Sequence, residues 1–308
     1  MNTSLKESRP YGILLVLTAG CCWGFHGILI KKAFTFGASF QQVFLLETLF
    51  ATLFFLFFKK SLGAKDRPKT NTQWRDLLIC GAASMGIGTF LFLSFSLGPV
   101  AIGATLLFLY LPQVYGYSVL SGIQGFSYSK AFAILLLLIG AGITTNIIGA
   151  FQGRGYSGAV FAALAASVCY AIIFLFTPRL AEATSATFRS FSISFVCFVG
   201  SAAMLLAFPI VRNQTPIDWA PLAGLAIILG FFGQTLPIIT LMKGIPLVGG
   251  SLAGALASIE LPIAVLCSAI FLGETVGIHQ MIGVALVFIG IILFNLSKET
   301  TSPKTIAA

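Results

Sequence analysis

The chain is divided almost completely into apolar runs of the length that crosses a lipid bilayer. Ten such runs can be read, at residues 11–30, 38–58, 77–97, 100–120, 130–150, 157–177, 187–211, 219–242, 247–272 and 277–296. A transmembrane helix needs about 20 apolar residues, and its backbone polar groups must bond within the segment because hydrocarbon offers no water. The pattern therefore predicts an all-α integral membrane protein with ten transmembrane helices, in contact with a lipid bilayer on all sides.

Charge is scarce, and it lies between the apolar runs. Only 9% of the 308 residues are charged, against roughly 25% in soluble domains. The formal net charge of +9 comes from cations at the run boundaries and forms no continuous basic face, so nucleic acid is not an expected partner. If the N-terminus is cytoplasmic, fourteen of the 18 Lys and Arg residues lie inside, which favours a multi-pass protein of the inner (plasma) membrane with both termini cytoplasmic.

An internal repeat divides the chain into two halves. Leu111-Pro112 recurs as Leu261-Pro262, 150 positions later. With five spans in each half, an odd number, the second half must enter the membrane from the opposite side. The sequence therefore predicts two inverted five-helix repeats, at residues 1–150 and 151–308.

Several stretches resemble the drug/metabolite transporter superfamily, specifically its EamA-type ten-helix exporters. They lie at residues 19–24, 88–97, 111–112, 261–275 and 283–290. The resemblance implies export of small organic molecules, such as amino acids or drugs, across the inner membrane by alternating access, often in exchange for protons. No cofactor is implied, and a monomer and a homodimer both remain open.

Glu47 and Glu260 are the carboxylates that lie near the middle of predicted spans, where a charge costs at least a few kcal/mol. On a continuous helix, Glu260 would share an inward face with the small residues Ala253, Ala257 and Ala264. Desolvation disfavours its charged form, which suits proton coupling. The alternative is a structural hydrogen bond made by the protonated acid.

Glu47 shares a helical face with aromatic side chains, at Phe44, Phe50 and Phe54. Such rings can support a bound ammonium group, whereas the alternative is that Glu47 pairs with His26. An imidazole can relay protons near neutral pH, although a neutral packing histidine is also compatible with the sequence. We assign proton coupling to Glu260, Glu47 and His26 as a hypothesis.

Aromatic and polar side chains in the spans are candidates for contact with substrate. Trp23 and Tyr170 occupy similar places in the two halves, and Tyr110 and Gln113 flank Pro112. The predicted substrate-binding set is Trp23, Glu47, Tyr110, Gln113, Tyr170 and Glu260. Aromatic residues also serve for ordinary packing in membranes. Pro112 and Pro262 are predicted hinges, because proline removes a backbone donor and breaks a helix, and the glycines of the spans permit close helix approach.

Catalytic and metal-binding patterns are missing from the sequence. There is no HExxH, GxSxG or phosphate-binding loop, so we expect a protein that is not an enzyme. The six cysteines lie in apolar runs without a CxxC pair, so no metal site is expected. Two alternatives to a metabolite exporter are a lipid-carrier flippase and a non-transporting membrane sensor.

Overall fold

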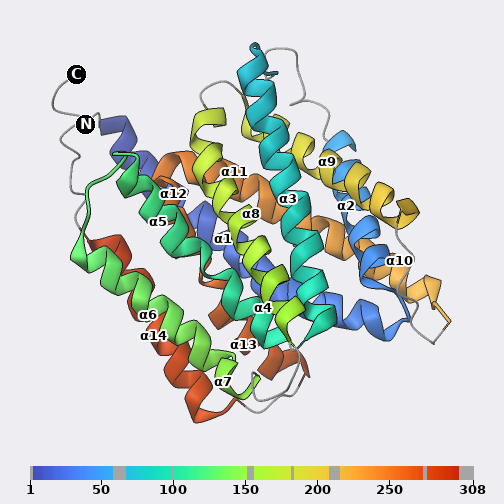
Figure 1. The fold of residues 1–308 in the computed structure, drawn as a ribbon. Coiled ribbons are helices and arrows are strands. Elements are labelled where there is room, and N and C mark those ends of the chain that lie inside the picture. The colour runs from blue at the N-terminus through green and yellow to red at the C-terminus, as the bar shows by residue number, and fades with distance from the viewer. Residues whose placement is uncertain are drawn as a thin grey trace.

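The apolar runs of the sequence are helical over most of their length. The computed structural model describes residues 3–57, 67–98, 100–150, 156–181, 184–207, 216–272 and 276–297, and these contain no strand. The elements (Figure 1) are α1 (Thr3–Thr35), α2 (Phe40–Phe57), α3 (Asn71–Leu97), α4 (Val100–Leu107), α5 (Tyr110–Leu120), α6 (Tyr128–Thr144), α7 (Ile147–Ala150), α8 (Ser157–Ala181), α9 (Ala186–Ala207), α10 (Trp219–Ile228), the π-helix η3 (Leu229–Thr235), α11 (Leu236–Val248), α12 (Gly250–Ala257), α13 (Glu260–Leu272) and α14 (Ile278–Leu296).

Eight helical segments of the described residues are long and apolar enough to cross a membrane. Two of the ten predicted spans are not among these eight. Residues 100–120 form the separate helices α4 and α5, and residues 130–150 form the 17-residue α6 followed by α7. An all-helical membrane protein is confirmed, while the count of ten spans stays a prediction.

Two helical pairs are interrupted at places 150 positions apart. The pair α4 and α5 breaks before Tyr110, and the pair α12 and α13 breaks before Glu260. A proline ring clashes with the carbonyl four residues earlier, and Pro112 and Pro262 stand in the first turn of α5 and α13. At both breaks an i→i−3 bond closes a tighter turn, from the Leu111 amide to the Phe108 carbonyl at 3.0 Å and from the Leu261 amide to the Ser258 carbonyl at 3.2 Å.

The break corrects one prediction about the face of Glu260. Ala253 and Ala257 lie on α12, whereas Glu260 and Ala264 lie on α13. The four residues therefore do not line one continuous helical face, because the chain turns at residues 258–259 between them.

Glycines let several helices pack with their backbones close together. A Cβ atom added to Gly140 of α6 would lie 2.8 Å from the Gly283 carbonyl of α14, and one added to Gly86 of α3 would lie 2.6 Å from the Cys169 Sγ of α8. Both helix pairs run side by side in Figure 1. Small residues at such crossings are how helices associate in lipid, where hydrophobic burial gives no driving force.

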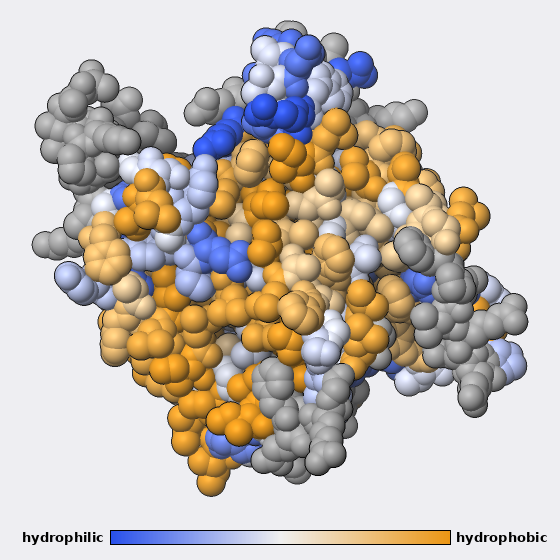
Figure 2. Space-filling model, in the orientation of Figure 1, coloured by the Kyte–Doolittle hydropathy of each residue, from blue (hydrophilic) through white to orange (hydrophobic). Residues whose placement is uncertain are grey.

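The outer surface is apolar over broad areas. Figure 2 shows orange side chains over most of the visible face, with hydrophilic side chains gathered near the start of α3. Large hydrophobic residues stand fully outside the bundle, among them Leu120 and Leu206, which are both 89% exposed. Apolar area on this scale is unstable in water and matches a hydrocarbon surrounding.

Candidate functional site

A buried histidine–carboxylate pair joins α1 to α2. His26 Nε2 lies 3.0 Å from Glu47 Oε1, with the side chains 16% and 2% exposed. The second carboxylate oxygen of Glu47 has no hydrogen-bond partner among the described residues. Ionisable side chains inside a membrane-spanning bundle are rare and often mark substrate or proton pathways, so this pair is a candidate functional site.

The π-helix η3 packs its backbone directly on this pair. A Cβ atom added to Gly233 would lie 2.8 Å from His26 Nε2 and 2.9 Å from Glu47 Oε1. The Gly233 carbonyl accepts a hydrogen bond from Trp23 Nε1 at 3.0 Å. π-Helical turns are rare and occur frequently at functional sites. Only glycine leaves room at this position for both side chains.

Glu260 completes a group of three titratable side chains from three helices. It is the first residue of α13, directly after the helix break. Its backbone lies against the helix that carries His26, since a Cβ atom added to Gly24 of α1 would lie 2.6 Å from the Glu260 carbonyl oxygen. Glu260 is half-buried, so part of its surface stays accessible although it lies inside the bundle. The structure thus brings together the three residues that the sequence analysis assigned to proton coupling.

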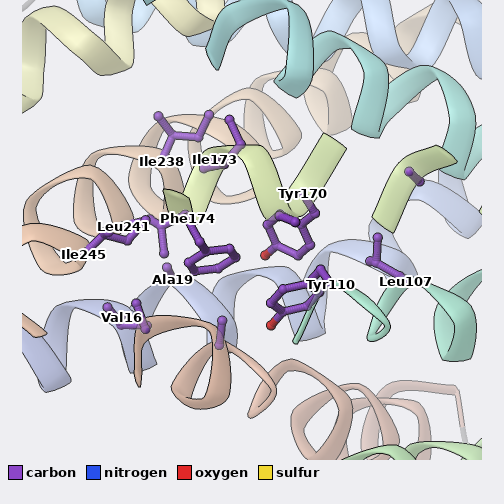
Figure 3. Close-up of a cluster of buried hydrophobic side chains, with 14 of the residues drawn as sticks. Val16, Ala19, Leu107, Tyr110, Tyr170, Ile173, Phe174, Ile238, Leu241 and Ile245 are labelled. Carbon is purple, nitrogen blue, oxygen red and sulfur yellow. The ribbon is translucent and has the colours of Figure 1, made fainter. Parts of the chain in front are cut away.

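Aromatic rings from α1, α5 and α8 form a cluster beside these acids. Tyr170 lies 5.9 Å from Trp23, 4.5 Å from Tyr110 and 5.1 Å from Phe174, measured between ring centroids. The Tyr110 hydroxyl donates to the Gly254 carbonyl of α12 at 2.7 Å. Figure 3 shows the rings of Tyr110, Tyr170 and Phe174 facing one another. Trp23 belongs to this cluster and also donates to the Gly233 carbonyl next to the His26–Glu47 pair, so the cluster adjoins that pair.

Other predicted residues make contacts of their own. Gln113 turns toward α8, where its Nε2 donates to Ser167 Oγ at 3.0 Å. Of the phenylalanines predicted to share a face with Glu47, Phe44 lies 5.9 Å from Phe92 and Phe54 lies 5.3 Å from Phe231 of η3, measured between ring centroids. The structure therefore shows Glu47 paired with histidine. Within the described ranges, no three His, Cys, Asp or Glu side chains are placed to hold a metal ion.

In the sequence, Gly233 is one of many glycines that permit close helix approach. Its neighbours offered a signal, because Gly230 and Gly233 stand shortly before Pro237 in an otherwise apolar run. Glycines close to proline mark places where regular helical bonding is weakened. The contact with His26 and Glu47 depends on tertiary packing and has no local signature.

Gly24→Ala tests how closely α1 approaches the break before Glu260. A Cβ atom at Gly24 would lie 2.6 Å from the Glu260 carbonyl oxygen, whereas one at Gly27 would meet nothing within 4 Å. We expect Gly24→Ala to lower the melting temperature by roughly 3–10 °C, because overpacking costs about 1–3 kcal/mol. Gly27→Ala is the matched control and should melt like the native protein. Equal melting temperatures for the two variants would contradict this packing.

An apolar helical bundle that holds titratable side chains in its interior has the architecture of a membrane transport protein. The chain belongs to the EamA-like transporter family, whose model matches it twice, over residues 10–146 and 157–296. It is therefore a membrane transporter of the drug/metabolite transporter superfamily and not an enzyme.

Known proteins that are similar to this chain over nearly its whole length include the following two. One is an uncharacterized transporter, YcbK of Bacillus subtilis (strain 168), which is 24% identical over 320 residues and covers 98% of each chain. The other is a solved structure described only as "Crystal structure of protein". It has a TM-score of 0.74 and 16% sequence identity, and the match covers 94% of this chain and 98% of that one. At this identity the second similarity shows the fold alone.

Proposed function

We propose that the protein is a secondary active transporter that exports small organic metabolites across the inner membrane in exchange for protons. The observation that carries this proposal is the buried His26–Glu47 pair, with Glu260 on a third helix whose start lies against α1. Intramembrane ionisable residues that face one another inside a bundle are typical of proton and substrate pathways. Amino acids and drugs are the substrate classes that the family resemblance favours.

Alternating access between two halves of opposite orientation is the proposed mechanism. The two matches to the family model and the matching helix breaks before Tyr110 and Glu260 support two equivalent halves, at residues 1–150 and 151–308. We infer ten spans, with both termini cytoplasmic, because five spans in each half invert the second half. Substrate would bind where the halves meet, and Pro112 and Pro262 would act as hinges beside the breaks.

Coupling follows from competition for the same carboxylates. A proton on Glu260 neutralises it and lets the empty transporter change its orientation at low electrostatic cost. On the cytoplasmic side, a substrate bearing an ammonium group would displace that proton, with Trp23, Tyr110 and Tyr170 contacting its organic part. Exclusive occupancy by either proton or substrate gives exchange.

A binding screen followed by flux measurement tests this function. The purified protein is melted with each member of a library of amino acids and other small metabolites, at about pH 6 and about pH 8. We expect at least one compound to raise the melting temperature, more strongly at the higher pH, where protons compete less. The same compound should then accumulate in inverted vesicles that contain the protein, and not in vesicles without it. Binding with no flux would favour a sensor and contradict the proposal.

A further inference from the structure

Arg189 is a buried cation that the proposed transport site does not use. It lies in the first turn of α9 and is 2% exposed. Neither ion pair found among the described residues includes it. A guanidinium stays charged in proteins, so its burial in an apolar bundle requires other compensation.

Backbone carbonyls supply that compensation. Nη2 of Arg189 donates to the Met242 carbonyl of α11 at 2.6 Å. Nη1 donates to the Thr184 carbonyl and lies 3.4 Å from Thr184 Oγ1. Nε has no hydrogen-bond partner in the described part of the chain. Both terminal nitrogens of the guanidinium are therefore engaged by backbone carbonyls.

The Met242 carbonyl lacks its usual helical hydrogen bond because of the residue four positions later. In an α-helix it would receive the backbone N–H of residue 246. That residue is Pro246, which lies inside α11 and has no N–H to donate. A buried carbonyl without a donor costs about as much as a lost hydrogen bond. Arg189 therefore donates to the carbonyl that Pro246 cannot satisfy.

We propose that Arg189 is a positioning residue that replaces the missing backbone donor of Pro246 and so fastens the proline-containing end of α11 to the start of α9. On its other side, α11 packs against α1, where a Cβ atom added to Gly244 would lie 3.0 Å from the Gly12 carbonyl. At its beginning, α11 continues directly from η3, which carries Gly233. Arg189 thus fixes the helix that places Gly233 on the His26–Glu47 pair.

The consequence for movement rests on the proposed transport function. Releasing Arg189 would leave a buried charge and a buried carbonyl without partners, which is strongly unfavourable. The α9 start and the α11 end therefore stay joined throughout the transport cycle and move as one unit.

A double-mutant cycle between residues 189 and 246 tests the proposal. Arg189→Met removes every donor at similar length, and Pro246→Ala restores the backbone N–H to the Met242 carbonyl. Melting temperatures are measured for the native protein, both single variants and the double variant. We expect Arg189→Met to lower the melting temperature more in the native protein than in the Pro246→Ala variant, by roughly 3 °C or more. In the Pro246→Ala variant the Met242 carbonyl keeps a backbone donor, so one fewer buried carbonyl loses its hydrogen bond.

Two controls make the cycle decisive. Pro178, inside α8, is the matched proline, and Pro178→Ala should leave the cost of Arg189→Met unchanged. Arg189→Lys keeps a donor and should lose less than Arg189→Met. If Arg189→Met fails to fold alone but folds with Pro246→Ala, the proposal is supported. Equal losses in both backgrounds, or failure to fold in both, would overturn it.

The melting temperatures do not depend on transport, so they test the role of Arg189 even if the proposed transport function is wrong. Where a transported compound is in hand, its uptake per inserted molecule adds a second readout. Pro246→Ala should restore uptake to the Arg189→Met protein. Restored stability without restored uptake would show that Arg189 has no positioning role in transport.

Discussion

Glu260→Gln is expected to remove the pH dependence of transport while the protein still inserts in the membrane. Glutamine matches glutamate in shape but exchanges no proton, so the helix break before residue 260 should be preserved. Uptake of a transported compound into inverted vesicles is measured at about pH 6 and about pH 8, and the coupled component should fall about tenfold or more. Insertion is checked by the amount of protein extracted from the vesicle membrane.

The control for this experiment is an acid outside the site. Asp218 precedes α10 and is exposed, so Asp218→Asn removes one carboxylate without touching the buried group. It should leave both the rate and its pH dependence unchanged. If Glu260→Gln keeps native uptake at both pH values, Glu260 has no part in the coupling.

Gly233→Ala is expected to abolish most transport through one added methyl group. Its Cβ atom would lie 2.8 Å from His26 Nε2 and 2.9 Å from Glu47 Oε1, so either the pair separates or η3 moves away. Movement of η3 would also break the hydrogen bond from Trp23 to the Gly233 carbonyl. We expect uptake to fall by about tenfold or more, because displacement of about 1 Å at a functional site can cost that much.

Gly224→Ala is the matched substitution for Gly233→Ala. Gly224 lies on α10 in the same predicted span, and a Cβ atom there would meet nothing within 4 Å. Alanine favours a helix over glycine by roughly 0.5–1 kcal/mol, so this variant should be at least as stable as the native protein and transport normally. Similar uptake by Gly224→Ala and Gly233→Ala would show that the contact between η3 and the pair is unimportant.

The helical, membrane-embedded fold could be predicted from the sequence because a single physical rule governs it. A backbone in hydrocarbon must satisfy its own hydrogen bonds, so an apolar run of span length becomes a helix. The break near Glu260 could also be anticipated, since Pro262 acts on the carbonyl four residues before it. Its position corrected the expected face of Glu260, because a helical face does not continue through a break.

The remaining features depend on contacts between residues far apart in the chain. Trp23 and Gly233 are 210 positions apart, and Arg189 and Met242 are 53 apart. The pairing of His26 with Glu47 appeared in the sequence analysis only as an alternative, because the directions of both side chains depend on how α1 and α2 pack. That Pro246 leaves the Met242 carbonyl without a backbone donor can be predicted from the local sequence. The side chain that donates to this carbonyl instead comes from another helix and cannot.

Proton movement during substrate transport tests the central claim most directly. The protein is reconstituted in liposomes that enclose a pH-sensitive dye, and a transported compound is added while its flux and the internal pH are recorded together. We predict that protons move opposite to the substrate in the native protein, and that Glu260→Gln abolishes the proton signal. Native substrate flux with no accompanying proton movement would contradict exchange at the buried acids.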